Sequence, residues 1–466
     1  MIRGRAMLVR DKSFYSTFFK LSAIIAAQNL LSFGVSLADN IMLGRYSETT
    51  LAAAAMVNQI QFLLQMVSVG GIGAGTMVMV SQYWGKGDIE PIRRIIALAM
   101  KFTLAIGLIF FLIAITIPGH VVSIFTSDPT VHPEAVTYLR ILCFTFLIFP
   151  VYATLLSSIR GAKIVIIGTI ISVVSLLVNT ILNYMFIFGN FGAPEMGIAG
   201  AAYATLISHF VALLITLIYL RCVDKKLHIK LLSFFKPDAY YLSDFFKAAI
   251  PVVLSGFSWG IGMMLQVVIL GHMSKGIVAA NSIASTVYSL ITAFSFGLVS
   301  SSNVIMGNLV GSGEMEKIRP TTRTLQLLYI AVGVVTAIVL FFARDLILGI
   351  YILEPDTYDL ARRFISLLVI VVVFASYQYP AASGIVMGGG NTRYPVIVET
   401  LFIWLCVLPL SALSAFVWDL PPIVTFLFLK SDQFLKCIPN AIVVNRYRWV
   451  RVLTRDGTDA PGKLEP

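Results

Sequence analysis

Residues 20–46 read KLSAIIAAQNLLSFGVSLADNIMLGRY, a stretch that is apolar enough to cross a bilayer and yet contains the carboxylate of Asp39. A helix of about 20 apolar residues spans the hydrocarbon core of a membrane. An aspartate near the centre of such a helix costs about 2.5 to 3.5 kcal/mol on insertion scales, and acids of this kind face a cavity or a partner inside the protein. The stretch therefore predicts a membrane helix in which Asp39 has a function.

The composition extends this prediction to the whole chain. Of the 466 residues, 58% are apolar and 12% are charged, with a mean hydropathy of +0.89, whereas soluble domains have about 25% charged residues. We predict an all-α polytopic membrane protein with twelve transmembrane helices. The predicted spans are residues 17–45, 50–82, 95–118, 134–158, 164–189, 198–220, 245–271, 277–308, 322–343, 361–387, 394–417 and 421–444.

The basic residues are distributed unevenly among the loops. A net charge of +11 could indicate nucleic acid, but the Lys and Arg residues cluster before the first predicted span and after the second, fourth, sixth and eighth. The loops between hold little more than Arg45, Lys275 and Arg344. This is the positive-inside pattern. We expect a multi-pass protein of the inner (plasma) membrane with both termini in the cytoplasm, and no nucleic-acid partner.

Motifs of enzymes and cofactor sites are missing from the sequence. The four cysteines are scattered without the spacing of a metal site or a disulfide framework. There is no GxxxxGK[ST] phosphate loop, no HExxH and no nucleophile elbow. The N-terminus runs into the first span without a cleavage site, so we expect this helix in the mature protein. We expect no enzymatic activity, no cofactor, no required partner protein, and no metal beyond a possible Na⁺ at Asp39.

An internal repeat divides the chain. At an offset of about 227 residues, WGKGDIEPIRR (84–94) pairs with VGSGEMEKIRP (310–320), and SIRGAK (158–163) pairs with IVMGGGNT (385–392). An even number of crossings between the copies gives both the same orientation. We predict two six-helix lobes: an N-lobe at 13–220, a cytoplasmic linker at 221–243, a C-lobe at 244–447 and a cytoplasmic tail at 448–466. Asp39 aligns with Gln266, so its chemistry belongs to the N-lobe alone.

Polar residues of the fifth and sixth predicted spans are the expected partners of Asp39. Asn179 and Asn183 stand one helical turn apart, as do Ala201 and Thr205. Two amides and a hydroxyl around a carboxylate can keep it charged, coordinate a small cation or hydrogen-bond the protonated acid. Hydrogen bonding between helices is the commoner use of such residues in membranes. We predict that these five residues form a site for a coupling ion.

Other polar and aromatic residues are candidates for lining a hydrated cavity or binding substrate. Gln28, Ser32, Ser36 and Asp39 follow steps of four, four and three and are expected to share one helical face. The candidates are Gln28, Ser36, Asn58, Gln61, Gln65, Trp259 and Gln266. Packing inside the bundle is the alternative for each of them.

Four further ionisable residues are expected to be structural. His209 is expected to be hydrogen-bonded in the core, and Glu399 is expected to reach the membrane interface from the start of its helix. Asp432 and Lys436 have the i,i+4 spacing of an ion pair. We assign no function to these residues.

The chain resembles the multidrug and toxic compound extrusion (MATE) transporters over nearly its whole length. The resemblance rests on QNLLSFGVSLADNIMLGR, NTILNYMFIFG, GIAGAAYATLIS and GIVMGGGNTRYP, which occur in order. It implies two six-helix lobes around a V-shaped cavity, and export of organic cations against inward H⁺ or Na⁺ flow. Asp39 matches the family's aspartate in the first helix and Asn179 its asparagine in the fifth. Ala201 and Thr205 match the sixth-helix contributors, while Asn183 stands where many members have a second acid.

Departures from the family pattern concern the C-lobe and the first helix. Ile24 replaces a proline often found there, although Pro251 is kept at the matching position of the seventh span. Trp259 and Ser376 stand where the NorM-like branch has a glutamate and an aspartate. The resemblance therefore favours coupling through the N-lobe, as in DinF-like members.

The leading hypothesis is an antiporter that exports amphipathic organic cations by alternating access in exchange for H⁺ or Na⁺. We favour H⁺, because the site has one negative charge and a proton needs only one carboxylate. To bind Na⁺, the same weakly charged site would have to offset the free-energy cost of dehydrating the ion. A lipid or lipid-linked sugar flippase is the alternative, but the predicted spans within 17–220 and 245–417 contain almost none of the Lys and Arg residues that a pyrophosphate would require. A receptor or scaffold would leave the repeat and the buried acid unexplained.

Overall fold

The computed structural model is a bundle of helices. The structure describes residues 8–126, 128–229, 240–271, 275–349 and 355–455, and no strand occurs within these ranges. Residues 230–239 of the predicted linker and 456–466 of the predicted tail lie outside them. The predicted all-α fold is confirmed, and the exact lobe boundaries stay predictions.

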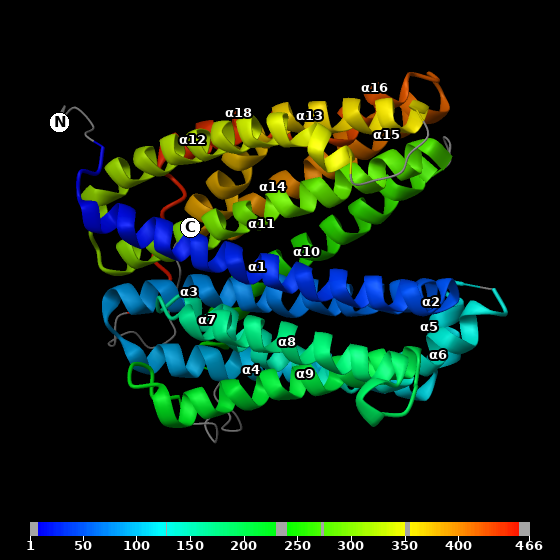
Figure 1. Cartoon of the computed structure of the whole chain (residues 1–466). Helices are drawn as coiled ribbons and strands as arrows, with labels where there is room; N and C mark the ends of the chain where they lie inside the picture. The colour runs from blue at the N-terminus through cyan, green and yellow to red at the C-terminus, as the bar shows by residue number, and fades with distance from the viewer. Residues whose placement is uncertain (1–7, 127, 230–239, 272–274, 350–354, 456–466) are drawn as a thin grey trace.

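The helices of the predicted N-lobe form one bundle, coloured blue to green in Figure 1. Helices α2 and α3 are joined by the π-helical segment η1 into a single span, while α6 and α7 meet at a bend of 54°. The bounds are α1 (Lys12–Tyr46), α2 (Glu48–Gln65), η1 (Met66–Gly73), α3 (Ala74–Lys86), α4 (Ile89–Thr116), α5 (Pro118–Ser123), α6 (Val131–Leu142), α7 (Thr145–Arg160), α8 (Ile166–Phe188), η2 (Asn190–Gly192), α9 (Ile198–Ile218) and η3 (Tyr219–Val223).

The helices of the predicted C-lobe form the second bundle, coloured green to red in Figure 1. π-Helical segments again interrupt two of its spans, between α13 and α14 and between α14 and α15. The bounds are α10 (Leu242–Gly271), α11 (Lys275–Gly311), α12 (Met315–Leu348), α13 (Pro355–Tyr379), η5 (Pro380–Val386), α14 (Arg393–Phe402), η6 (Ile403–Val407), α15 (Leu408–Phe416), α16 (Pro422–Leu429), α17 (Ser431–Leu435) and α18 (Cys437–Arg446).

Most of the predicted spans correspond to continuous helices. Among the described residues, ten helices are long and apolar enough to cross a membrane, and the bent pair α6–α7 makes an eleventh span. The twelfth predicted span, 421–444, is not one helix. It is divided into α16, α17 and α18, with breaks at Lys430 and Lys436. The predicted twelfth span is therefore helical but interrupted, and at its first break Lys430 leaves the helical backbone region, with φ −109° and ψ 5°.

The two bundles make close backbone contacts along one seam. A Cβ atom added to Gly311 of α11 would lie 1.8 Å from the carbonyl oxygen of Gln82 in α3, and one added to Gly85 would lie 2.1 Å from that of Asn308. Further along the seam, the hydroxyls of Ser22 and Ser301 are hydrogen-bonded at 2.6 Å. Any side chain at these glycines would force the lobes apart.

The seam ends part of the way along α10. A Cβ atom added to Gly256 would lie 3.2 Å from the carbonyl oxygen of Met66, but one added to Gly260, a turn further on, would meet no atom of the described residues within 4 Å. Phe62 and Trp259 touch across this point, with ring centroids 6.2 Å apart. The two bundles thus diverge beyond Trp259, as their ribbons do toward α5 and α6 in Figure 1.

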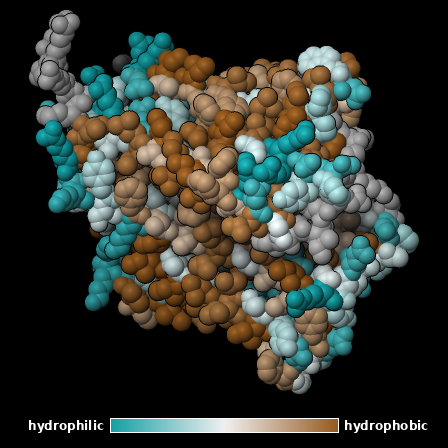
Figure 2. Space-filling view, turned by 45° about the horizontal axis from the view of Figure 1, so that its top comes forward, coloured by the Kyte–Doolittle hydropathy of each residue, from teal (hydrophilic) through white to brown (hydrophobic). Residues whose placement is uncertain are grey.

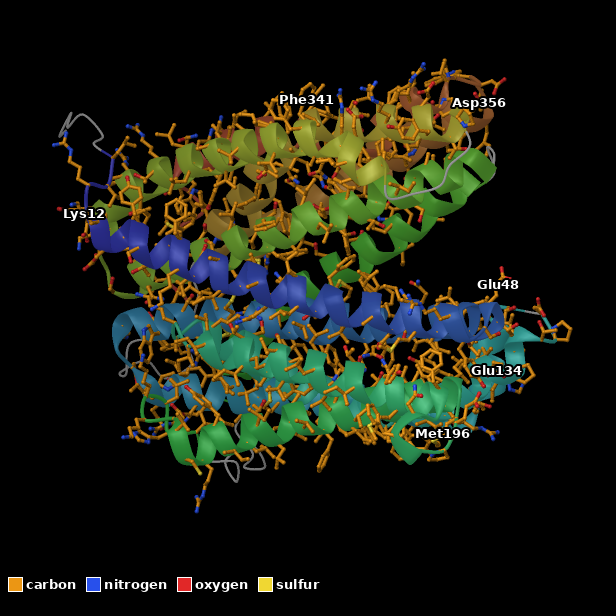
Figure 3. All side chains as sticks on the ribbon, viewed as in Figure 1. Lys12, Glu48, Glu134, Met196, Phe341 and Asp356 are labelled. Carbon is orange, nitrogen blue, oxygen red and sulfur yellow. The ribbon has the colours of Figure 1, made fainter. Side chains whose placement is uncertain are left out.

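The two ends of the molecule are distinguished by their residues. Lys12 lies at the end where the lobes meet, whereas Glu48, Glu134, Met196 and Asp356 lie at the end where they diverge (Figure 3). We call these the Lys12 end and the Glu48 end. Between them, Figure 2 shows a broad band of apolar residues with polar residues toward both sides. Such a band is the surface expected of a protein that lies in a bilayer.

Candidate functional site

Asp39 faces the interior of the N-lobe, where α1 packs along α8. The side-chain amide of Asn183 donates a hydrogen bond to Asp39 Oδ1. The same nitrogen, Asn183 Nδ2, donates to Asn179 Oδ1 at 3.2 Å, and Asn179 Nδ2 in turn donates to the Thr205 hydroxyl at 3.4 Å. Both asparagines are completely buried, while Asp39 is half-buried. Four of the five sequence-predicted residues are therefore brought together in one hydrogen-bonded chain.

The chain of hydrogen bonds leaves one acceptor unused. Asn183 Oδ1 is buried and has no hydrogen-bond partner in the part of the chain that the structure describes. A buried amide oxygen without a partner costs about 1 to 3 kcal/mol. It lies next to a carboxylate, so a cation or an O–H group bound to Asp39 would supply the missing partner.

Helix α9 closes the other side of this site. Ala201 and Thr205 are both buried, and Ala201 packs in the N-lobe core. The approach of α8 and α9 is close, because a Cβ atom on Gly200 would lie 2.5 Å from the carbonyl oxygen of Phe186. Small residues on this face of α9 therefore allow Thr205 to reach Asn179.

Tyr138 of α6 also belongs to the site, although the sequence did not single it out. It is 2% exposed and packs in the same buried cluster as Ala201. A tyrosine in an apolar membrane helix gives no signal of its partner in the sequence. The available ligands around Asp39 are thus one carboxylate, amide oxygens and hydroxyls, which suit a proton or a hard cation. Among the described residues, no group of three or more His, Cys, Asp or Glu side chains gathers as a metal site.

Gln28 does not line a cavity, contrary to the sequence-based prediction. It is buried, and its amide nitrogen donates to the Val165 carbonyl at 2.8 Å and to the Thr169 hydroxyl at 3.1 Å. Its amide oxygen accepts a hydrogen bond of 2.8 Å from Arg160. Gln28 therefore ties α1 to the turn between α7 and α8, because its side chain is long enough to satisfy three groups there.

Ser36 does not share a helical face with Gln28, although the sequence analysis expected this. Eight residues after Gln28, it is rotated by about 80° around the helix from that residue. Gln28 and Asp39 both face α8, whereas Ser36 is exposed. Ser36 follows the face of α1 on which Ser22 and Asn29 contact α11 nearer the Lys12 end. It is therefore placed to line the opening between the lobes, but not with Gln28.

The three predicted cavity residues of α2 have different environments. Gln65 is exposed and Asn58 is half-buried. Gln61 lies 3.3 Å from His209 Nε2, and the Tyr152 hydroxyl lies 2.8 Å from His209 Nδ1. Gln61 thus points into the N-lobe, which favours the packing alternative for this residue. The prediction of His209 as a hydrogen-bonded core residue is confirmed.

A different face of α2 looks toward the C-lobe. Gln59 and Phe62 are exposed on it, and Phe62 contacts Trp259. The sequence analysis missed Gln59, although its spacing of three from Phe62 would place both on one face. Trp259 and Gln266 are half-buried on α10. Trp259 therefore lies at the point where the lobes part, as a substrate contact would require.

The C-lobe contains a buried charge cluster that the sequence did not predict as a unit. Lys436 is 1% exposed and pairs with Glu399 at 2.8 Å and with Asp432 at 2.9 Å. Lys430 lies over the ring of Tyr288, 4.5 Å from its centroid. The predicted Asp432–Lys436 pair is confirmed. The expectation that Glu399 reaches the interface is wrong, because its carboxylate turns inward to Lys436.

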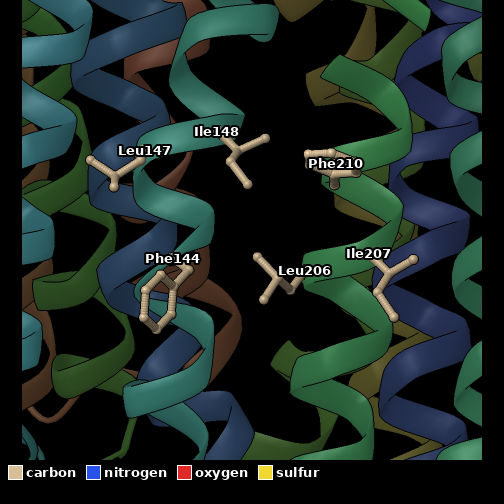
Figure 4. Close-up of a pocket in the computed structure, with 6 residues that line it drawn as sticks. All are labelled: Phe144, Leu147, Ile148, Leu206, Ile207 and Phe210. Carbon is tan, nitrogen blue, oxygen red and sulfur yellow. The ribbon is translucent and has the colours of Figure 1, made fainter. Parts of the chain in front are cut away.

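One apolar pocket lies between α7 and α9 on the N-lobe, apart from the polar residues described above (Figure 4). Its volume is about 370 Å³. The lining residues are Phe144, Leu147, Ile148, Leu206, Ile207 and Phe210. With no polar side chain in its lining, this pocket has nothing to bind an ion.

Comparison with known proteins gives consistent matches. The MatE family model matches residues 25–185 and 251–413. The probable multidrug resistance protein NorM of Thermotoga maritima is 23% identical over 442 residues, covering 94% of both chains. That of Rhizobium meliloti is 27% identical over 419 residues, covering 85% of this chain and 87% of the relative.

Solved structures show the same fold. The outward-facing conformation of a multidrug resistance MATE family transporter of the MOP superfamily has a TM-score of 0.84 with 17% identity, covering 94% of this chain and 98% of that one. A MATE structure in the straight conformation has a TM-score of 0.83, also with 17% identity, covering 92% and 95%.

Proposed function

Since the chain belongs to the MatE family of transporters, we propose that it is a cation-coupled antiporter that exports amphipathic, cationic organic compounds across the cell membrane by alternating access. Two relatives named as probable multidrug resistance proteins support drug export. The positive-inside distribution of Lys and Arg supports a cytoplasmic Lys12 end. In this orientation the lobes are closed toward the cytoplasm and diverge toward the outside.

The observation that carries the proposal is the pairing of Asp39 with Asn183. An acid inside a membrane helix requires a partner that offsets its burial. Asn183 supplies one N–H to Asp39 and keeps a buried oxygen without a partner among the described residues. A bound cation or proton would therefore satisfy the remaining hydrogen-bonding group of the site. In doing so it would change how α1 packs against α8.

Ion binding at Asp39 can shift the equilibrium between arrangements of the two lobes, because α1 contacts both α8 in the N-lobe and α11 in the C-lobe. On one face it meets α8 through Asp39 and Gln28, and on another it meets α11 through Ser22 and Asn29. A ligand shifts a conformational equilibrium only by its difference in affinity between the states. We propose that occupancy of Asp39 changes how α1 lies on α8 and thereby changes how its other face meets α11.

We propose H⁺ as the coupling ion. The site holds a single carboxylate, and Asn183 occupies the position where a second acid would strengthen Na⁺ binding. A protonated Asp39 needs only one hydrogen-bond acceptor, and Asn183 Oδ1 is one. In the C-lobe, the two positions where the NorM-like branch has acids are occupied by Trp259 and the buried Ser376. This supports coupling through the N-lobe.

The test is transport in proteoliposomes that contain the purified protein. Efflux of a fluorescent organic cation is compared under a pH gradient without sodium and under a sodium gradient at fixed pH. Transport driven by the pH gradient supports the proposal. Transport that requires sodium and ignores the pH gradient would overturn the proton assignment, and no transport under either gradient would overturn cation coupling.

A further inference from the structure

The residues after α18 form an extended segment that crosses the Lys12 end of the molecule, drawn in red in Figure 1. We call residues 449–455 the strap. It begins in the C-lobe, where Trp449 is 1% exposed and its indole N–H donates to the Val444 carbonyl at 2.9 Å. The Trp449 ring belongs to the same core cluster as Val444. The start of the strap is therefore a fixed part of the C-lobe.

The glycines between η5 and α14 hold the next residues of the strap. The Arg451 N–H donates to the Gly389 carbonyl at 2.8 Å. A Cβ atom on Gly389 would lie 2.1 Å from the Trp449 ring, and one on Gly390, where φ is +102°, would lie 2.2 Å from the Arg451 carbonyl oxygen. Side chains at these two positions would displace the strap, so this run of glycines is shaped to receive it.

The middle of the strap is bound by the N-lobe. Gln82 of α3 is completely buried, and its amide nitrogen donates to the Arg451 carbonyl at 3.0 Å while its amide oxygen accepts from the Leu453 N–H at 2.7 Å. The Arg455 N–H donates to the Tyr83 hydroxyl at 3.1 Å. Lys86 Nζ donates to the Arg455 carbonyl at 2.9 Å. Three residues near the end of α3 thus bind the backbone of the strap.

The far end of the strap returns to the C-lobe. The Arg455 guanidinium forms an ion pair of 2.6 Å with Asp244 in the first turn of α10. Its carbon also lies 4.7 Å from the centroid of the Tyr240 ring. Arg455 thus contacts both α3 and α10, so the strap is fixed in the C-lobe at its start and joins the two lobes from Arg451 onward.

We propose that the strap is a cytoplasmic latch, which holds the two lobes together at the Lys12 end and must release Gln82 before they can part there. This inference rests on the alternating-access part of the proposed function, because only an inward-opening protein has to separate Gln82 of α3 from Gly390. Trp449 lies in the C-lobe core, so the contacts with Gln82, Tyr83 and Lys86 are the ones that break. Losing them favours the state in which the Lys12 end is open.

The latch can be tested without knowing the substrate or the coupling ion. Ser301 is buried in the seam opposite Ser22, so a cysteine introduced by Ser301→Cys reports opening of the Lys12 end through its rate of alkylation. The four native cysteines are first replaced by serine. The reporter is then compared in the full chain, in a chain ending at Arg455, in a chain ending at Trp449, and in the full chain with Gln82→Ala.

The chain ending at Arg455 is the matched control, because it keeps the strap. We expect it to be alkylated as fast as the full chain. The chain ending at Trp449 and the Gln82→Ala variant should be alkylated about tenfold faster, which corresponds to about 1.4 kcal/mol in the opening equilibrium. Equal rates in all four proteins would overturn the latch. Faster alkylation in Gln82→Ala alone, with the chain ending at Trp449 unchanged, would overturn it as well.

A failure of the shortened chain to fold is covered by the second variant. If the chain ending at Trp449 is not recovered from membranes, Gln82→Ala in the full chain decides the question. An unchanged rate there overturns the latch, and a tenfold increase supports it. The two proposals fail in different assays. Loss of transport under every ion gradient would refute the antiport function, whereas the latch is judged by the alkylation rates alone.

Discussion

Asn183 donates a hydrogen bond to Asp39 across the interface of α1 and α8, and its own amide oxygen stays buried without a partner in the described ranges. A purely structural pair would be expected to satisfy both groups, because unpaired buried oxygens are unfavourable. The asymmetry of this contact is the reason for placing ion binding here rather than at Glu399 and Asp432 of the C-lobe, which are both paired with Lys436.

Replacing Asp39 tests whether its charge drives transport. Asp39→Asn keeps the size and hydrogen-bonding capacity of the side chain but removes the group that can gain and lose a proton. We expect a folded protein in the membrane with no ion-driven export in proteoliposomes. Asp356→Asn makes the same chemical change at an exposed position at the start of α13, and this control should retain export. Wild-type export by a well-expressed Asp39→Asn protein would contradict the assignment.

Adding a second acid tests the choice of ion. Asn183→Asp places two carboxylates in contact, and the added negative charge favours a bound cation. We expect a sodium gradient at fixed pH to drive export in this variant more strongly than in the wild type. Asn40→Asp makes the same change in charge at an exposed position of α1 and should leave the ion dependence unchanged. Equal sodium dependence in all three proteins would argue against a cation at this site.

Two C-lobe substitutions test whether coupling belongs to the N-lobe. Gln266→Ala and Ser376→Ala remove polar groups from positions without an acid, so we expect a modest change in substrate range or rate. The ratio of ions to substrate moved should stay the same. Measuring this ratio in proteoliposomes checks the prediction, and uncoupled transport in either variant would show that the C-lobe participates.

The buried charge cluster should be sensitive to the loss of Lys436, the cation that pairs with both of its acids. Lys436→Met leaves Glu399 and Asp432 without the ammonium group that pairs with both. Removing one partner of a buried ion pair costs about 3 to 5 kcal/mol. We expect thermal unfolding in detergent at a clearly lower temperature, and partial recovery when Glu399→Gln and Asp432→Asn are added.

An exposed ion pair provides the control for this stability measurement. Lys317 and Glu314 lie 2.9 Å apart, with side chains that are 66% and 43% exposed. Surface pairs contribute about 0 to 1 kcal/mol, so Lys317→Met should leave the unfolding temperature nearly unchanged. Similar effects of Lys436→Met and Lys317→Met would mean that the cluster contributes little to folding.

The sequence predicts the helical architecture well because hydropathy alone defines a membrane span. Eleven predicted spans correspond to continuous or bent helices of the described chain. The twelfth corresponds to three consecutive short helices with breaks at Lys430 and Lys436, two buried residues that an average over many apolar residues conceals. Whether a charged side chain turns inward depends on partners such as Glu399, which are distant in sequence.

The same distinction applies to the candidate site. Asn179 and Asn183 could be predicted as partners of Asp39, because their i,i+4 spacing places both on the face that meets α1. Gln28 could not be assigned correctly, since its environment is decided by Arg160 and Thr169 from other helices. Local spacing determines which residues share a face, and long-range packing determines whether that face meets water or protein.

The open space beside Gly260 has a consequence for how the range of exported compounds can change. A side chain added there meets no described atom within 4 Å, and replacing glycine inside a helix by alanine favours the helix by about 0.5 to 1 kcal/mol. A mutation at this position would therefore narrow the route between the lobes without a cost in folding. Under selection by a new toxin, single substitutions at Gly260 offer a short adaptive path that leaves the ion site of the N-lobe untouched.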